Sequence, residues 1–185
     1  TAMAKVTWAL DPSHSEVQFR VRHMMISNVT GQLQKFDVSV ETEDNDFSTA
    51  KIRFTGDPNT ISTNNEQRDG HLQSNDFFDT ANHPEIIFEG DRMEKTGDDA
   101  YKLHGTFTMR GVSKPLTLDV EYGGMAKNPW GNTLAGFTVT GKINRKDFGL
   151  VYNTALETGG VLIGDEVKIT AQAEFVRQDE EAAAS

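Results

Sequence analysis

Apolar and polar residues alternate with a period of two along most of this chain, the pattern of strands with one buried and one exposed face. In residues 16–23, for example, Val17, Phe19 and Val21 share one face, and the polar residues between them share the other. The same alternation predicts about nine strands, at 6–10, 16–23, 29–41, 51–55, 86–92, 101–109, 116–122, 135–143 and 167–175. Because turn-forming residues separate these segments, we predict an all-β antiparallel fold.

The alternation changes parity once, inside residues 29–41. Leu33 lies at an odd position, whereas Phe36, Val38 and Val40 lie at even positions. A β-bulge between them would keep one buried face and sharpen the bend, as the closing of a barrel requires. A break that divides the segment into two strands is the alternative.

One segment departs from the strand pattern. Thr63 and Glu66 are three residues apart, as in a capping box, and they predict a short helix over 64–73, interrupted at Gly70 or continuous. A second helical turn is expected over 145–148. These one or two short helices would cap or flank the strands.

The charge of the chain narrows its classes of partner. The 185 residues include 28 acidic and 18 basic side chains, a net charge of −10, and no cysteine. Disulfide scaffolds and thiolate sites are therefore excluded, and a nucleic-acid partner is not expected. No apolar run approaches the roughly 20 residues of a membrane span, so we expect no stable membrane insertion.

We expect a single domain over residues 6–177. Residues 1–5 would be a disordered start or a cloning remnant, and the acidic residues 178–185 would be a frayed tail. The first ten residues lack the basic and apolar regions of a signal peptide, so we expect a cytoplasmic protein, with the mature form of an exported protein as the alternative. The oligomeric state is not decided, and a homodimer stays open.

Motifs for catalysis or metal binding are scarce. There is no Gly-x-Ser-x-Gly elbow, and the partial phosphate loop at 136–142 has Ile143 where Ser or Thr must hold magnesium. None of the five histidines has a partner at ligand spacing, and His14 is expected to bond neighbouring backbone. We therefore predict no enzyme activity, no metal and no cofactor.

Aromatic residues carry the remaining signal. Eleven phenylalanines against two tryptophans, mostly at inward positions, would give apolar walls with few polar groups. An eight-stranded barrel is either just filled by side chains or just wide enough for one small ligand. Small residues at Gly105, Ala135, Ala171 and Ala173, opposite phenylalanines, favour a tunnel; an ordinary filled core is the alternative.

Four blocks of sequence together resemble the YceI-like family. They are W-A-L-D-P-S-H-S-E-V-Q-F-R-V-R-H at 8–23, the segment 63–88 that opens T-N-N-E-Q-R-D-G-H-L, L-H-G-T-F-T-M-R-G-V-S-K-P-L-T-L at 103–118, and N-R-K-D-F-G-L at 144–150. The resemblance implies an extended antiparallel eight-stranded lipocalin-like barrel. It also implies that an internal pore binds a polyisoprenoid, such as a prenyl quinone or prenyl phosphate, or a similar lipid, for carriage, storage or transport.

Candidate ligand-binding residues follow from inward parity together with this resemblance. The predicted apolar pore comprises Val17, Phe19, Val21, Ile52, Phe54, Phe77, Phe78, Phe88, Leu103, Phe107, Leu118, Phe137 and Val139. Arg68, His71 and Arg145 are the candidates for contacting the head group, arginine because its fork suits phosphate. Alternatively, Arg68, Asp69 and Asp76 form a salt-bridge cluster that holds the helix over the barrel end.

The adjacent residues Phe77 and Phe78 would point to opposite sides of an extended chain. We expect this segment to act as a lid, with one ring plugging the barrel and the other packing under the helix. Two further functions stay open beside lipid carriage. One is an enzyme acting on such a lipid, with His71 or His14 as base oriented by Asp69 or Asp76. The other is a stress-response structural protein whose barrel is filled by side chains.

Overall fold

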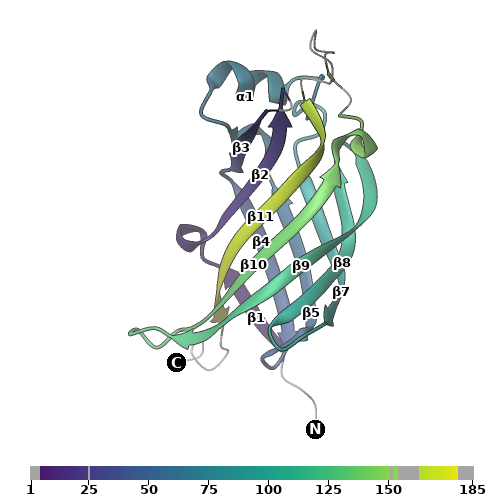
Figure 1. Cartoon of the computed structure of the whole chain (residues 1–185). Helices are drawn as coiled ribbons and strands as arrows, with labels where there is room; N and C mark the ends of the chain where they lie inside the picture. Colours follow the sequence, from purple (N-terminus) through teal and green to yellow (C-terminus); the bar gives the residue numbers. More distant parts are fainter. Residues whose placement is uncertain (1–4, 25, 151, 154–162, 179–185) are drawn as a thin grey trace.

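The computed structural model describes residues 5–24, 26–150, 152–153 and 163–178 (Figure 1). The expected disordered start at 1–5 lies outside these ranges except for Lys5, and the expected frayed tail lies outside them except for Gln178. The strands are β1 (Lys5–Leu10), β2 (Glu16–His23), β3 (Ser27–Leu33), β4 (Phe36–Glu43), β5 (Asp46–Gly56), β6 (Ile61–Ser62), β7 (Ile86–Lys95), β8 (Ala100–Met109), β9 (Val112–Lys127), β10 (Thr133–Asn144) and β11 (Ile163–Gln178). The helical segments are α1 (Glu66–Gln73) and the 3-10 turns η1 (Pro12–His14), η2 (Pro58–Thr60) and η3 (Arg145–Phe148).

The strands form one antiparallel sheet that closes on itself. Its order is β1-β4-β5-β7-β8-β9-β10-β11-β2-β3-β6, and β1 also pairs with β11. Strand β11 pairs with β2 up to Gln172 and with β1 from Phe175, so β1 and β2 act as one strand bent at η1. Because β3 and β4 continue each other in the same way, the described residues build an eight-stranded barrel, which confirms the predicted fold class.

The parity change after Leu33 marks a strand break and not a bulge. The amide of Gln34 donates to the carbonyl of Thr60 at 3.2 Å, and the amide of Asp57 donates to the carbonyl of Lys35 at 3.0 Å. The segment around η2 thus satisfies the backbone groups that leave the sheet at the bend. The bulge alternative is wrong at this position.

Helix α1 forms where the sequence predicts it, but a different residue caps it. The Asn65 side chain accepts a hydrogen bond from the amide of Arg68 at 3.0 Å, which makes Asn65 the N-cap. Thr63 lies outside the helix, and its amide and hydroxyl both donate to the Asp69 carboxylate. The predicted capping box is therefore wrong, and Gly70 does not interrupt the helix.

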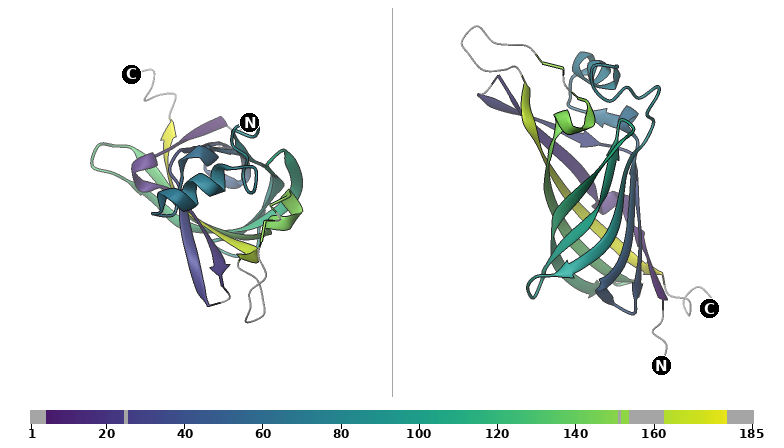
Figure 2. Two further views of the ribbon diagram at one scale, coloured as in Figure 1. Left: turned by 90° about the horizontal axis from the view of Figure 1, so that it is seen from above. Right: turned by 90° about the vertical axis from the view of Figure 1, so that its right-hand side faces the viewer.

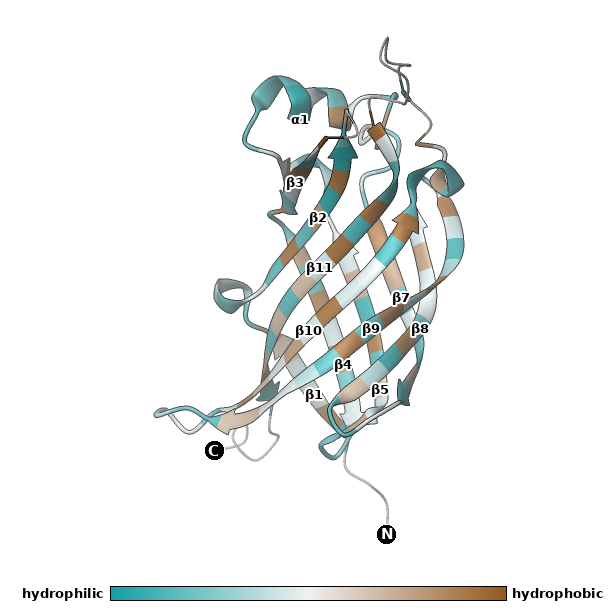
Figure 3. Ribbon diagram, viewed as in Figure 1, coloured by the Kyte–Doolittle hydropathy of each residue, from teal (hydrophilic) through white to brown (hydrophobic). Residues whose placement is uncertain are grey.

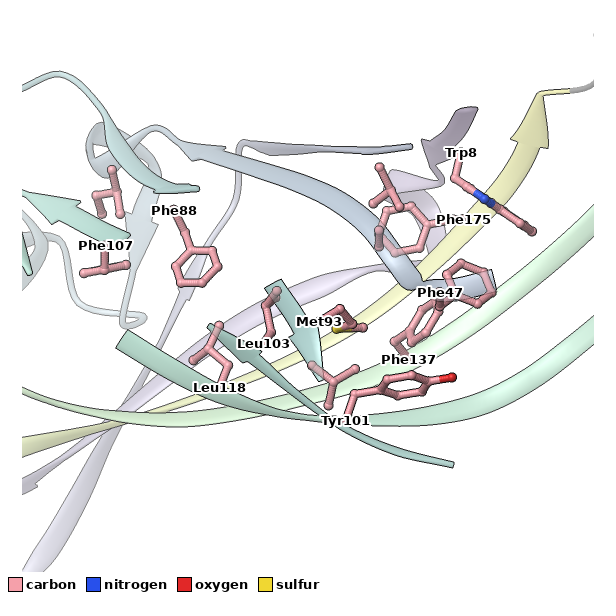
Figure 4. Close-up of a cluster of buried hydrophobic side chains, with 14 of the residues drawn as sticks. Trp8, Phe47, Phe88, Met93, Tyr101, Leu103, Phe107, Leu118, Phe137 and Phe175 are labelled. Carbon is pink, nitrogen blue, oxygen red and sulfur yellow. The ribbon is translucent and has the colours of Figure 1, made fainter. Parts of the chain in front are cut away.

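One end of the barrel is filled by aromatic side chains. The Phe47 ring lies 5.0 Å from Trp8, 5.6 Å from Tyr122 and 4.9 Å from Phe137, and Phe137 lies 6.0 Å from Phe175 (Figure 4). Such tilted and edge-on pairs fill the interior at the end of the barrel where β1 begins and β11 ends (Figure 1). Helix α1 lies across the opposite end (Figure 2).

Along the strands between these ends, apolar and polar residues alternate as the sequence pattern requires (Figure 3). On β8 the residues at alternate positions from Tyr101 to Met109 are buried, while their neighbours are exposed or half-buried. The inward set of each strand therefore faces the enclosed space of the barrel.

Candidate functional site

A cavity of about 410 Å³ lies inside the barrel, between the aromatic end and α1. Phe47, Phe137 and Phe175 line it at one end, and Leu72 and Phe77 line it at the other. All thirteen residues of the predicted apolar pore lie on its wall: Val17, Phe19, Val21, Ile52, Phe54, Phe77, Phe78, Phe88, Leu103, Phe107, Leu118, Phe137 and Val139. The structure thus brings the set together, and contact of these residues with a ligand stays a prediction.

Polar side chains are few on this wall. In the part of the chain that the structure describes, the charged, amide, imidazole and hydroxyl residues that line the cavity are Glu16, Gln18, His23, Thr63, Arg68, His71, Arg145, Tyr152 and Gln172. The three predicted head-group residues are among them. Arg68 and His71 belong to α1, so they place polar groups at the end of the cavity opposite the aromatic cluster.

Arg68 is held by neutral partners. Its Nε donates to the Thr63 hydroxyl at 2.7 Å, and its Nη2 donates to the Thr63 carbonyl at 2.7 Å. Among the described residues no ion pair joins Arg68 to Asp69 or Asp76, because Asp69 accepts from Thr63 and Asp76 contacts His71. The predicted salt-bridge cluster is therefore wrong, and the Thr63 hydroxyl instead links the Arg68 guanidinium to the Asp69 carboxylate.

His71 belongs to an aromatic group under α1. Its ring lies edge-on to Phe77 at 5.0 Å and to Tyr152 at 4.8 Å, and its Nε2 lies 2.7 Å from Oδ2 of Asp76. The spacing of the sequence does not predict this His71–Asp76 pair. It arises because the chain after α1 folds back in tight turns.

Those turns also change the expected placement of Phe77 and Phe78. The amide of Phe77 donates to the Ser74 carbonyl and that of Phe78 to the Leu72 carbonyl, so the segment is not extended. Both rings line the cavity, and Phe77 is buried while Phe78 is half-buried. The segment is therefore not extended as expected, and its action as a lid stays a prediction.

Arg145 holds the backbone around η3. Its side chain is 3% exposed and donates to the carbonyls of Leu150, Tyr152, Ile163 and Gly164. Burial lowers the pKa of the guanidinium, and Asp165 nearby opposes that shift. Because its N–H groups donate to backbone carbonyls, we no longer propose that Arg145 contacts the head group, although it lines the cavity.

The small residues behave in two ways. Ala171 and Ala173 line the cavity and leave space there. Ala135 is only 1% exposed and belongs to the filled core, and Gly105 is covered by the Phe88 ring, whose Cζ would lie 2.6 Å from a Cβ at that position. The expectation of open space is therefore wrong at Gly105 and Ala135.

Outside the cavity, the His14 amide donates to the Asp11 carbonyl at 3.2 Å, as expected of a residue that bonds neighbouring backbone, while its side chain lies among carboxylates. Its Nδ1 is 2.8 Å from Oδ2 of Asp11 and 3.3 Å from Oε2 of Glu174, and the ligand atoms of the three residues lie within 4.8 Å of one another. Hydrogen bonds from Ser13 and His14 lower the pKa of Asp11 to about 2, and Asp11, followed by Glu174, raises the pKa of His14. Spacing along the chain could not show this cluster, because Glu174 reaches it only through the barrel closure.

Several residues of the cavity wall were not among the predicted pore residues. Val167 and Ile169 have the inward parity of β11 but were absent from the predicted pore. Leu72 and Tyr152 also line the cavity, and no periodicity marks them because they lie in a short helix and an irregular segment.

Comparison with known proteins places this architecture. The profile of the YceI-like domain matches residues 8–175. The chain belongs to the YceI-like family. A UPF0312 protein of Staphylococcus aureus strain N315 is 44% identical over 169 residues, which cover 91% of this chain and 96% of that protein. This match confirms the family resemblance carried by the four sequence blocks.

Solved structures share the fold of this YceI-like protein. A Campylobacter jejuni YceI protein is 32% identical with a TM-score of 0.74, covering 85% of this chain and 90% of that one. Burkholderia cenocepacia BcnA is 20% identical with a TM-score of 0.76, covering 89% and 98%. A polyisoprenoid-binding domain from Saccharophagus degradans is 14% identical with a TM-score of 0.62, covering 95% and 99%.

Proposed function

We propose that this YceI-like protein binds a long-chain polyisoprenoid, such as a prenyl quinone or a prenyl phosphate, inside its barrel for carriage, storage or transport. The observation that carries the proposal is the cavity of about 410 Å³, with an almost wholly apolar wall and the Arg68 guanidinium at one end. A prenyl chain has no polar groups, so its site needs apolar surface and few hydrogen bonds.

The size of the cavity suits part of such a chain. An apolar cavity of about 150 Å³ holds one benzene ring, so about 410 Å³ would hold on the order of 16 carbons, or about three isoprene units. Ten deeply buried carbons at roughly 0.8 kcal/mol each would contribute about 8 kcal/mol before ordering costs. Micromolar binding corresponds to about the same free energy, so the cavity would suffice if the remaining buried carbons offset those costs.

The open cavity favours this proposal over a structural protein with a filled barrel. Side chains fill the end around Phe47 and Phe137, but the wall formed by Ala171 and Ala173 leaves space. The likeness to a domain described as polyisoprenoid-binding is a second support, since that domain shares the fold.

Lipid extraction tests the proposal directly. The purified protein is extracted with organic solvent, the extract is examined by mass spectrometry, and the delipidated protein is then offered prenyl quinones and prenyl phosphates in solution. We expect a stoichiometric isoprenoid in the extract or saturable uptake afterwards. Absence of both would overturn the proposal.

One observation favours a second candidate, an enzyme that acts on the bound lipid. Asp76 lies 2.7 Å from His71 on the cavity wall, the pairing that a general base requires. However, Phe77 and Tyr152 both lie edge-on against the His71 ring. Conversion of the bound isoprenoid to a new species during incubation, lost in His71→Gln, would establish an enzyme; recovery of unchanged lipid supports carriage.

A further inference from the structure

Three basic side chains form a row on the outer surface of the barrel. The register places Lys142 of β10 directly opposite Lys168 of β11, and Lys168 directly opposite Arg20 of β2. All three residues are exposed. The three strands run side by side on the near face in Figure 1. Lys142 lies near the end of β10 that leads into η3, and Lys168 lies near the start of β11.

This arrangement is costly in a chain with a net charge of −10. Like charges directly opposite each other destabilise a sheet, and elsewhere in this barrel cations oppose acids, as Lys102 does Asp119 and Arg53 does Glu89. In the row, Lys142 has Glu166 at 3.4 Å. Within the described residues, neither Lys168 nor Arg20 forms an ion pair, so the row leaves positive charge for an external anion.

An exposed apolar tip lies beside the row. The turn between β2 and β3 carries Met24, which is 42% exposed, and Ile26, which is 79% exposed. Arg20 precedes this turn on the same strand, and the β2–β3 hairpin flares away from the barrel at the end that α1 covers (Figure 2). Exposed apolar residues next to basic ones are typical of segments that lie in a membrane interface.

We propose that this edge, made of Lys142, Lys168, Arg20, Met24 and Ile26, docks the protein on the surface of an anionic lipid bilayer. Ile26 and Met24 enter the interface, and the basic row faces the phosphates. The proposal rests on the proposed function, because an apolar ligand held in the cavity must be exchanged with a bilayer. An acidic protein would be drawn by the charges alone and would not require the exposed Ile26.

Docking by this edge is peripheral and reversible. None of the helices in the described ranges has the length and apolar character needed to cross a bilayer. The overall negative charge opposes adsorption everywhere except at the basic row, so binding is expected to be weak, oriented and sensitive to salt.

Vesicle flotation tests the proposal. We compare vesicles of phosphatidylcholine with equimolar phosphatidylcholine and phosphatidylglycerol, for the wild type, Arg20→Glu/Lys168→Glu and Ile26→Ser. Each basic residue near an anionic surface contributes roughly a five-fold gain, so we expect the charge variant to lose about 10-fold or more in partitioning to anionic vesicles. Ile26→Ser should also weaken binding, and added salt should weaken that of the wild type.

Two matched controls lie at the opposite end of the barrel. Lys95→Glu/Lys127→Glu makes the same change in net charge at exposed lysines, and Trp130→Ser removes a side chain that is 82% exposed in the β9–β10 turn. Both controls should bind vesicles as the wild type does. Equal loss in these controls, no binding of the wild type, or unchanged binding of the charge variant would overturn the docking proposal.

Uptake of a prenyl phosphate from detergent-free solution separates this proposal from the proposed function. Arg20 and Lys168 face outward, so their charge variant should take up the ligand as the wild type does while losing vesicle binding. Normal vesicle binding without any uptake would remove the proposed function and leave the docking surface in place.

Discussion

Nδ1 of His14 lies 2.8 Å from Oδ2 of Asp11 at the bend where β1 passes into β2. The Asp11 amide also donates to the Glu174 carbonyl at 2.9 Å, where β11 changes its partner from β2 to β1. The charged pair therefore lies at the joint that lets two short strands act as one, and its protonation should be linked to the stability of the barrel.

That linkage gives a stability difference that depends on pH. The pKa of His14 is raised in the folded protein above its unfolded value of 6.5. Protonated His14 therefore stabilises the fold fully below pH 6.5, and this stabilisation is lost as the pH rises through the folded pKa. The pKa of Asp11 is lowered from 3.8 to about 2 in the folded protein. Ionised Asp11 therefore stabilises the fold fully above pH 3.8, and this stabilisation is lost as the pH falls toward about 2. We therefore expect His14→Gln to destabilise the protein more at about pH 5 than at about pH 9.

Denaturant unfolding of both proteins at the two pH values measures this difference. Glu174→Gln serves as a comparison, and its effect should follow the same pH trend with a smaller size, because Asp11 is the larger cause of the His14 shift. An equal loss in the free energy of unfolding for His14→Gln at both pH values would contradict the linkage.

Gly105 should not tolerate a side chain. A Cβ there would meet the Glu89 carbonyl oxygen and would lie 2.6 Å from Cζ of Phe88, so Gly105→Ala overpacks the wall. We expect a loss of about 1–3 kcal/mol in the free energy of unfolding. Gly136→Ala is the matched control, because a Cβ there has nothing within 4 Å, and it should be neutral or stabilising.

This glycine shows where sequence reasoning ends. Alternation located the strands, because burial on one face imposes a period of two whatever the neighbours are. It could not show that the Phe88 ring covers Gly105, or that Phe19 covers Gly31, because that depends on which strands are adjacent. The wall residues on the strands could thus be predicted from parity, whereas the empty volume could not.

Arg145 should be essential to the fold. Replacing it with methionine leaves the buried carbonyl of Leu150 and the partly buried carbonyls of Tyr152 and Gly164 without their donor, and the loss of a buried partner costs about 1–3 kcal/mol. We expect Arg145→Met to lower the free energy of unfolding by about 2–5 kcal/mol. Lys146→Met, at an exposed neighbour, should change it little, and equal stability of the two variants would contradict the structural role.

The charged candidates were harder to separate from sequence than the apolar ones. Arg68 lies within α1 and Arg145 begins η3, and both look alike as cations near the end of a barrel. Their roles differ in their partners. Arg145 donates to backbone carbonyls before β11 and at its start, whereas Arg68 donates to Thr63. These partners depend on how the chain folds back around each arginine, which residue spacing alone does not show.

Filling the cavity should block uptake without unfolding the barrel. Ala171 lines the cavity on β11, and Ala171→Phe would place a ring in that space. We expect saturable uptake of a prenyl quinone to fall at least about tenfold, since the lost volume displaces several carbons worth roughly 0.8 kcal/mol each. Thr170→Phe, which faces outward on the same strand, is the control and should take up the ligand normally.

Arg68 should select the head group. Arg68 lines the cavity wall, and within the described residues no carboxylate forms an ion pair with its guanidinium, so it can donate to a phosphate. Arg68→Gln keeps a polar side chain but removes the charge, and we expect affinity for a prenyl phosphate to fall about 10-fold or more, because a hydrogen bond to a charged group contributes roughly 1.5–3 kcal/mol. Affinity for the corresponding prenyl alcohol should change little, because the alcohol carries no charge. Thermal unfolding of the variant separates this effect from the lost Thr63 contacts, and an equal loss of affinity for both ligands would show that Arg68 only shapes the site.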